Sequence, residues 1–177
     1  MCGGLSLILG GFIGHGTALS ILFWRKFMEK LHFCNEGERK YALACLEFAK
    51  QLGIIDNSSL DAVLARCNSE NEKRKAMAER GEVFYGVTHF TPNAYLDYEL
   101  TRFKLDFAGE TPQVKRNYSY KEITRKDKKA FYKNNRDLFT RYNNDRFLFF
   151  EVSTVIHKKI REEQYDAEIN NILCKLS

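Results

Sequence analysis

Helix start signals recur along this chain, and few segments between them show the alternation of apolar and polar residues that is typical of strands. At several positions a Ser, Thr or Asn side chain precedes an apolar repeat, where its oxygen can accept a hydrogen bond from a free backbone N–H of the first turn. Asn35 and Thr124 are each followed three residues later by an acid, as in a capping box, and Thr91 stands before a proline, which is favoured at the first helical position. These candidate caps are Asn35 with Glu38, Ser58 or Ser59, Thr91 with Pro92, and Thr124 with Asp127.

Apolar residues after these caps recur at intervals of three to five residues, mostly the three-to-four spacing of a buried helix face. The spacing predicts a helix that ends near Gly53, a second that ends near Gly109, and one long C-terminal helix. Both prolines, Pro92 and Pro112, fall at expected boundaries. We therefore expect an all-α fold with several helices. The two clearest stripes are Leu96, Leu100, Phe103 and Phe107, and Val152, Ile156, Ile160, Tyr165, Ile169, Ile172 and Leu176.

The N-terminal segment differs in composition from the rest. Residues 3–24 carry no charge, and six of the eleven glycines lie in the first sixteen positions. A secretory signal would place its basic residues before the apolar run, whereas Arg25 and Lys26 follow it, so we expect no cleaved signal. We predict a Gly-rich segment over residues 1–16, then one helical domain over residues 17–177 whose first helix is capped by Thr17 or Ser20. A membrane anchor is the alternative, which we do not favour.

The expected absence of a cleaved signal and the cysteine content favour a cytoplasmic protein with free thiols. The 28 basic and 23 acidic residues leave a formal charge of +5, which permits acidic partners without requiring them. The five cysteines are odd in number and form no CxxC pair, which favours small buried apolar residues over disulfides or metal ligands. A membrane-anchored location remains the alternative.

Two passages resemble the helical shell of the SurA/PrsA/trigger-factor class of foldases. The first is "AKQLGIIDNSSLDAVLARCNSENEKR" at residues 49–74. The second joins "TRKDKKAFYKNNRDLF" at 124–139 to "FLFFEVSTVIHKKIREEQYDAEI" at 147–169. The segments 124–139 and 147–169 resemble the helices that, in that class, come before and after a parvulin proline-isomerase domain. Such a domain cannot fit into residues 140–147. The resemblance implies a SurA N-terminal-like chaperone domain without its enzyme.

The sequence offers no catalytic or metal site that we could assign. The four histidines lie on four different expected elements, without a spacing that would place two ligands on one helix face. No GxxxxGK[ST] segment is present to bind a phosphate. We therefore expect no catalytic residue, no metal and no cofactor, and an isomerase activity is kept only as an alternative.

The resemblance implies a protein that holds unfolded or extended polypeptide segments through apolar and aromatic contacts. Exposed apolar patches mark such surfaces. The aromatic residues that we expect to face a client are Phe84, Tyr85, Phe90, Tyr95, Tyr98, Phe147 and Phe149.

Two other classes of function remain open. One is a scaffold or maturation partner dedicated to a single protein or peptide, which would bind one client tightly instead of many weakly. The other is a nucleic-acid-binding module, because residues 115–136 hold nine basic and two acidic residues among several aromatics. We expect no nucleic acid, since the aromatics of this stretch belong to a helix whose apolar face should be buried.

The short connection at residues 140–145 bears on assembly. We expect the apolar stripe at residues 19–31 to pack against the last helix. A short hinge can also let that helix exchange into a second copy, so a homodimer by helix exchange is expected.

Overall fold

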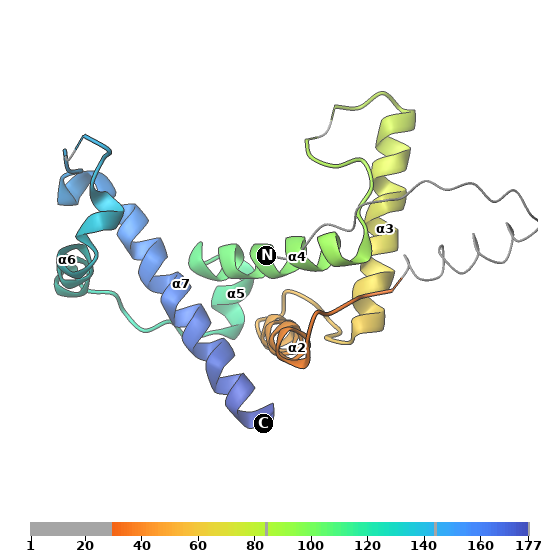
Figure 1. Ribbon diagram of the computed structural model, residues 1–177, viewed down its shortest axis with the longest axis horizontal. Coiled ribbons are helices and arrows are strands. Elements are labelled where there is room, and N and C mark those ends of the chain that lie inside the picture. Colours follow the sequence, from red (N-terminus) through yellow and green to blue (C-terminus); the bar gives the residue numbers. More distant parts are fainter. Residues whose placement is uncertain (1–29, 84, 144, 177) are drawn as a thin grey trace, which may run out of the picture.

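A computed structural model describes residues 30–83, 85–143 and 145–176, and these parts of the chain are mostly helical (Figure 1). They contain no strand, only one isolated antiparallel bridge between Thr140 and Arg146. The all-α prediction is confirmed. The Gly-rich segment 1–16 and most of the stripe at 19–31 lie outside the described residues. In chain order the elements are α2 (Glu36–Gln51), α3 (Leu60–Glu79), α4 (Pro92–Ala108), α5 (Pro112–Asn117), α6 (Arg125–Asn134), the short 3-10 helix η1 (Arg136–Phe139) and α7 (Phe149–Leu176).

Four of the helices, α2, α3, α4 and α6, begin at the predicted caps. Asn35 and Thr91 accept hydrogen bonds from the backbone N–H three residues on, and Thr124 forms a complete capping box with Asp127. Of the two serine candidates, Ser59 caps α3, while the hydroxyl of Ser58 donates to Glu47 on α2. Local sequence therefore sets where these helices start.

Gly53 ends the first of these helices, as predicted, with a φ of +70°. The N–H of Gly53 donates to Lys50 O and that of Ile54 to Ala49 O, which satisfies two carbonyls of the last turn. A Cβ at this position would also meet the Asn117 amide at 2.5 Å. Glycine is required here both by the left-handed backbone and by the close approach of α5.

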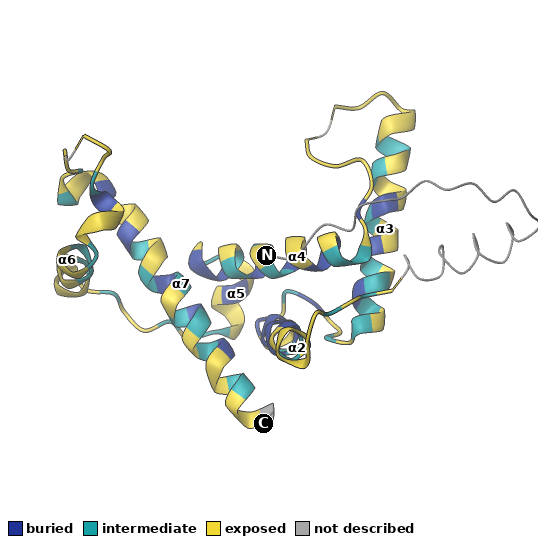
Figure 2. Ribbon diagram, viewed as in Figure 1, coloured by how far each residue is buried: buried dark blue, intermediate teal, exposed yellow. Residues whose placement is uncertain are grey.

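The larger of two apolar cores lies where α2, α4 and the C-terminal half of α7 meet (Figure 2). Phe48, Phe107 and Tyr165 come from these three helices, and their ring centroids lie 5.4–5.7 Å apart. Such aromatic pairs add to the stabilisation from burial alone. The predicted stripe on α4 is confirmed, since Leu96, Phe103 and Phe107 are buried and Leu100 packs against the same core.

A second, smaller core lies at the other end of α7. It contains Phe139, Val152 and Ile156, with partly buried side chains of α6 packed around it. Figure 1 shows α6 and η1 beside the first turns of α7, away from α2 and α3. We call residues 121–156 the arm; it comprises α6, η1, the connection to α7 and the first turns of α7.

The long C-terminal helix is confirmed, and it packs on α2, α4 and α6 of its own chain. The connection before it closes tightly, because Phe147 N donates to Phe139 O and Arg141 N donates to Asp145 O. The helix-exchange dimer stays a prediction. Within the described ranges, no helix combines the length and apolar character that a bilayer crossing would need.

Ile156→Ala should destabilise the protein by about 2–5 kcal/mol, because the side chain is fully buried in the smaller core and its removal leaves a cavity. Ile160→Ala should cost less, since Ile160 is only partly buried at the edge of that core. Denaturant unfolding measures both. If the last helix exchanges between copies, Ile156→Ala should also weaken the dimer in sedimentation. Equal costs for the two substitutions would contradict this placement.

Candidate functional site

The aromatic residues proposed to face a client are divided by the structure between surface and core. Tyr85 is 92% exposed and Tyr98 40% exposed, whereas Phe90 and Tyr95 are buried. Phe84 lies outside the described residues. The buried pair therefore leaves the candidate set, because neither ring can reach a client without opening the core.

Phe90 is fixed in the core by a side-chain clamp that the sequence did not reveal. The Asn71 amide accepts a hydrogen bond from Phe90 N and donates one to Phe90 O. The Arg74 guanidinium lies 4.6 Å from the centre of the Phe90 ring and donates to Val87 O. Both residues lie on α3, nineteen and sixteen positions before Phe90, so helix spacing alone gave no signal for them.

The arm holds the other predicted aromatics and adds one that was missed. Phe147 and Phe149 are half-buried against the second core, and Phe149 packs edge-on against Tyr132 at 5.8 Å. The next residue, Phe150, points away from that core and is 74% exposed. Consecutive residues on a helix face directions about 100° apart, which follows from 3.6 residues per turn. The helix period could therefore have predicted an exposed Phe150, once Phe149 was assigned to the core-facing side of the helix.

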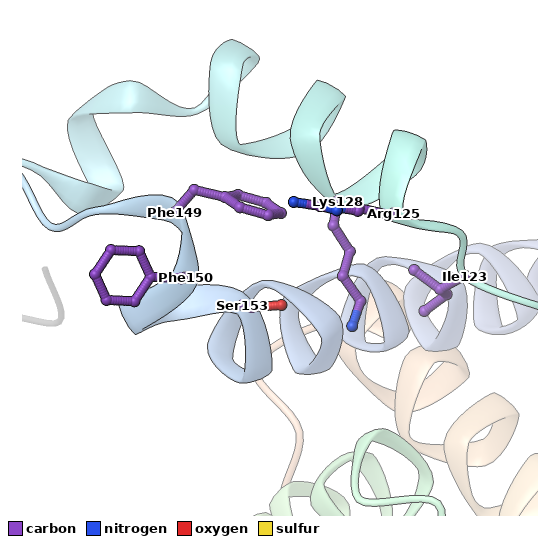
Figure 3. Close-up of a pocket in the computed structure, with 6 residues that line it drawn as sticks. All are labelled: Ile123, Arg125, Lys128, Phe149, Phe150 and Ser153. Atoms are coloured by element: carbon purple, nitrogen blue, oxygen red, sulfur yellow. The ribbon is translucent and has the colours of Figure 1, made fainter.

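A cavity of about 390 Å³ opens between α6 and the start of α7. It is lined by Ile123, Arg125 and Lys128 on one side and by Phe149, Phe150 and Ser153 on the other. Figure 3 shows the Phe149 ring pointing between the two helices toward α6, where Arg125 and Lys128 lie. The cavity therefore combines aromatic surface with two cations.

Most of the chain's net positive charge lies on the arm. Residues 121–156 contain nine basic and five acidic residues, a surplus of four out of a total of five. Three of the acids are engaged locally: Asp127 caps α6, Glu151 accepts from Leu148 N, and Asp145 pairs with Arg141. Among the described residues of the arm, Arg141 is the one cation in an ion pair within 4 Å.

A polar junction beneath the arm fixes it to the larger core. Glu110 Oε1 accepts from Arg161 Nε at 2.7 Å and bonds His157 Nε2 at 2.8 Å, while Oε2 pairs with Lys115 at 3.0 Å. Arg161 is 3% exposed, donates also to Lys121 O, and lies over the Tyr120 ring. These contacts hold the segment between α5 and α6 against α7.

Burial alone would raise the pKa of the Glu110 carboxyl. The hydrogen bonds from His157, Arg161 and Lys115 outweigh burial and lower this pKa from 4.5 to about 2. Glu110 also has a φ of +51°, in the left-handed region that non-glycine residues rarely adopt. A strained backbone with a strongly paired carboxylate indicates that tertiary contacts determine this position.

No cluster of His, Cys, Asp and Glu suited to a metal ion occurs within the described ranges. The four cysteines that the structure describes are free thiols, with Cys45 and Cys67 buried and Cys34 and Cys174 exposed. Burial raises the pKa of Cys45 to about 11, which keeps that thiol protonated at neutral pH.

No protein-family model matches the chain, and no curated protein matches it. Among solved structures, the chain is similar to a GH136 lacto-N-biosidase from Eubacterium ramulus, in crystals of the native protein and of its selenomethionine derivative. The TM-score is 0.67 and the identity 25% in both. The match covers 77% of this chain but only 28% and 27% of the enzyme chains. The chain thus spans about a quarter of the length of the proteins it resembles.

Acid should weaken the fold through Glu110. Because the pKa is lowered in the folded protein, the carboxylate contributes stability that is fully present above pH 4.5 and is lost as the pH falls toward 2. Glu110→Gln should lower the free energy of unfolding at neutral pH. This free energy should then fall less between pH 4.5 and 2 than in the unmodified protein. Urea unfolding at a series of pH values measures this. Glu36→Gln, at an exposed pair with Arg39, is the control and should leave the pH profile unchanged. An unaltered profile in Glu110→Gln would contradict the assignment.

Proposed function

We propose that this chain is a non-catalytic helical protein that binds polypeptide, and that its client is one dedicated partner, a glycoside hydrolase chain resembling lacto-N-biosidase. The observation that carries the proposal is the unequal coverage of the structural match. Three-quarters of this chain corresponds to about a quarter of an enzyme chain. Interfaces between the domains of one chain resemble those between two proteins, so a separate helical chain of this size can bind its partner in the same way.

The sequence resemblance to foldase shells supports the same type of function. The two passages that carry it fall on α2–α3 and on α6–α7. The tight closure at residues 140–147 leaves no room for a parvulin domain between the last two. We propose a SurA-like helical shell that binds polypeptide without the isomerase. The partner can belong to the same polypeptide or to another chain, since the contact surface is the same in both cases.

A general chaperone is the second candidate, and the exposed apolar residues favour it. Several large apolar side chains are at least half exposed on separate parts of the protein, among them Tyr85, Leu105, Leu138 and Phe150. Such surfaces can bind many unfolded clients weakly. The structural match favours the dedicated version, because it concerns one type of enzyme.

Selectivity separates the two versions. A dedicated partner protein should leave the aggregation of unrelated unfolded proteins unchanged in light scattering, even at several-fold excess. A general chaperone should delay aggregation of most of them near a one-to-one ratio. A broad delay would remove the dedicated version and leave polypeptide binding in place.

An isomerase assay tests the non-catalytic part of the proposal. The protein should not accelerate cis/trans interconversion of X-Pro peptides above the uncatalysed rate, whose time scale is about tens to hundreds of seconds. A concentration-dependent acceleration that persists after repurification would overturn this part.

A further inference from the structure

We infer that the arm is the surface that binds the partner polypeptide, and that the segment it binds is acidic and carries apolar or aromatic side chains. This inference rests on the proposed function and adds the site and the chemistry of the partner. It is carried by three features that coincide on the arm: exposed apolar side chains, uncompensated positive charge and a cavity that contains both.

The apolar part of the surface lies around the connection between η1 and α7. Leu138, Tyr142, Leu148 and Phe150 are all more than half exposed there, within thirteen positions of the chain. Phe149 lies among them with its ring turned into the second core. Exposed apolar side chains gathered in this way mark an interaction surface, whereas single ones are ordinary.

Charge complementarity identifies the partner as acidic. With nine basic and five acidic residues on the arm, the rest of the chain holds nineteen basic and eighteen acidic residues and is nearly neutral. The cations Arg125 and Lys128 line the cavity and form no ion pair within 4 Å among the described side chains. A surface that is both positive and apolar attracts an acidic segment and disfavours binding of a basic one.

The cavity fits one apolar side chain with a carboxylate beside it. The cavity is open to solvent, and its volume of about 390 Å³ leaves room for a single side chain of a bound segment. An aromatic or leucine side chain would contact the Phe149 ring, which points between the two helices (Figure 3). A neighbouring Asp or Glu would then lie within reach of the Arg125 guanidinium, which binds carboxylates through two parallel hydrogen bonds.

Nucleic acid is the competing partner for a basic aromatic surface, and the arrangement of the rings disfavours it. Binding of single strands requires exposed rings in series on which bases stack. Phe131 and Tyr132 of α6 instead face the second core and contact Phe139. Of the four large apolar residues of the arm that are more than half exposed, Tyr142 and Phe150 carry rings, while Leu138 and Leu148 offer none for stacking.

Binding of short fluorescein-labelled peptides to the full chain, followed by anisotropy, tests the inference. One peptide alternates Glu with Phe and Leu, a second replaces each Glu by Lys, and a third replaces each Phe and Leu by Ser. A fluorescein-labelled oligothymidine is the fourth probe. The Glu/Phe/Leu peptide should bind at least about tenfold more tightly than the others, and its affinity should fall as salt increases.

Two variants locate the site. The double substitution R125E/K128E and the single substitution Phe150→Ser should each weaken binding of the Glu/Phe/Leu peptide by about tenfold or more. The matched controls are K50E/K73E on α2 and α3, which reverses two exposed charges elsewhere, and Val83→Ser, which removes an exposed apolar side chain elsewhere. Both controls should bind like the unmodified protein, and thermal unfolding should show that all four variants are folded.

The outcomes separate this inference from the proposed function. If the arm variants bind like the unmodified protein, or the Lys or Ser peptide binds as tightly as the acidic one, the inference is overturned while polypeptide binding stands. If oligothymidine binds most tightly of the four probes, the arm is a nucleic-acid-binding surface and the inference is overturned. If none of the peptides binds, the acidic preference is overturned. The hydrolase complex then decides the proposed function by itself.

Discussion

Arg161→Ala should destabilise the protein by about 3 kcal/mol, the lower end of the range for breaking a buried ion pair, because Glu110 loses its buried partner but keeps Lys115 and His157. The Arg161 guanidinium donates to Glu110, Lys121 O and Gln164, and it covers the Tyr120 ring. Its loss also frees the segment that leads into α6. Urea unfolding measures the cost, and hydrogen exchange should show α6 and η1 opening more readily than α2.

An exposed arginine provides the control. Arg39→Ala removes an i,i+3 pair with Glu36 in which both side chains are about half exposed, and such pairs contribute at most about 1 kcal/mol. A cost for Arg161→Ala no larger than that for Arg39→Ala would show that the Glu110 junction does not fix the arm.

Phe107→Ala should cost about 3–5 kcal/mol, the usual range for removing a buried aromatic side chain. Phe107 is fully buried at the centre of the larger core, and its ring contacts those of Phe48, Tyr118, Tyr120 and Tyr165. Partial collapse around the cavity would place the value at the lower end. The free energy of unfolding from denaturant titration is the measurement.

Leu105→Ala, two positions earlier on the same helix, is the matched control. Leu105 is 60% exposed, so its truncation should change stability by no more than about 0.5 kcal/mol. Similar costs at positions 105 and 107 would contradict the orientation of α4 and, with it, the three-helix core.

The predictable part of this fold is local. Asn35, Ser59, Thr91 and Thr124 act within one turn of their own helices, and the α4 stripe follows from helix period and apolar type alone. The long C-terminal helix was predictable for the same reason. Such features need no knowledge of what packs against the helix.

The remainder depends on contacts between distant segments. Glu110 meets residues 47 and 51 positions later in the chain, and Asn71 meets Phe90 nineteen positions later. Asn71, rather than aromatic character, fixes Phe90 in the core. The same limit applies to the arm, where Phe149 and Phe150 are equivalent by composition and opposite in burial.

Co-expression with a lacto-N-biosidase-like glycoside hydrolase chain from the same organism tests the proposed function most directly. The account predicts that the two chains elute together as a complex of defined mass in size-exclusion chromatography with light scattering. It also predicts that the yield of soluble hydrolase falls when this chain is left out. A hydrolase that is soluble and active alone, and that elutes separately from this chain, would contradict the account.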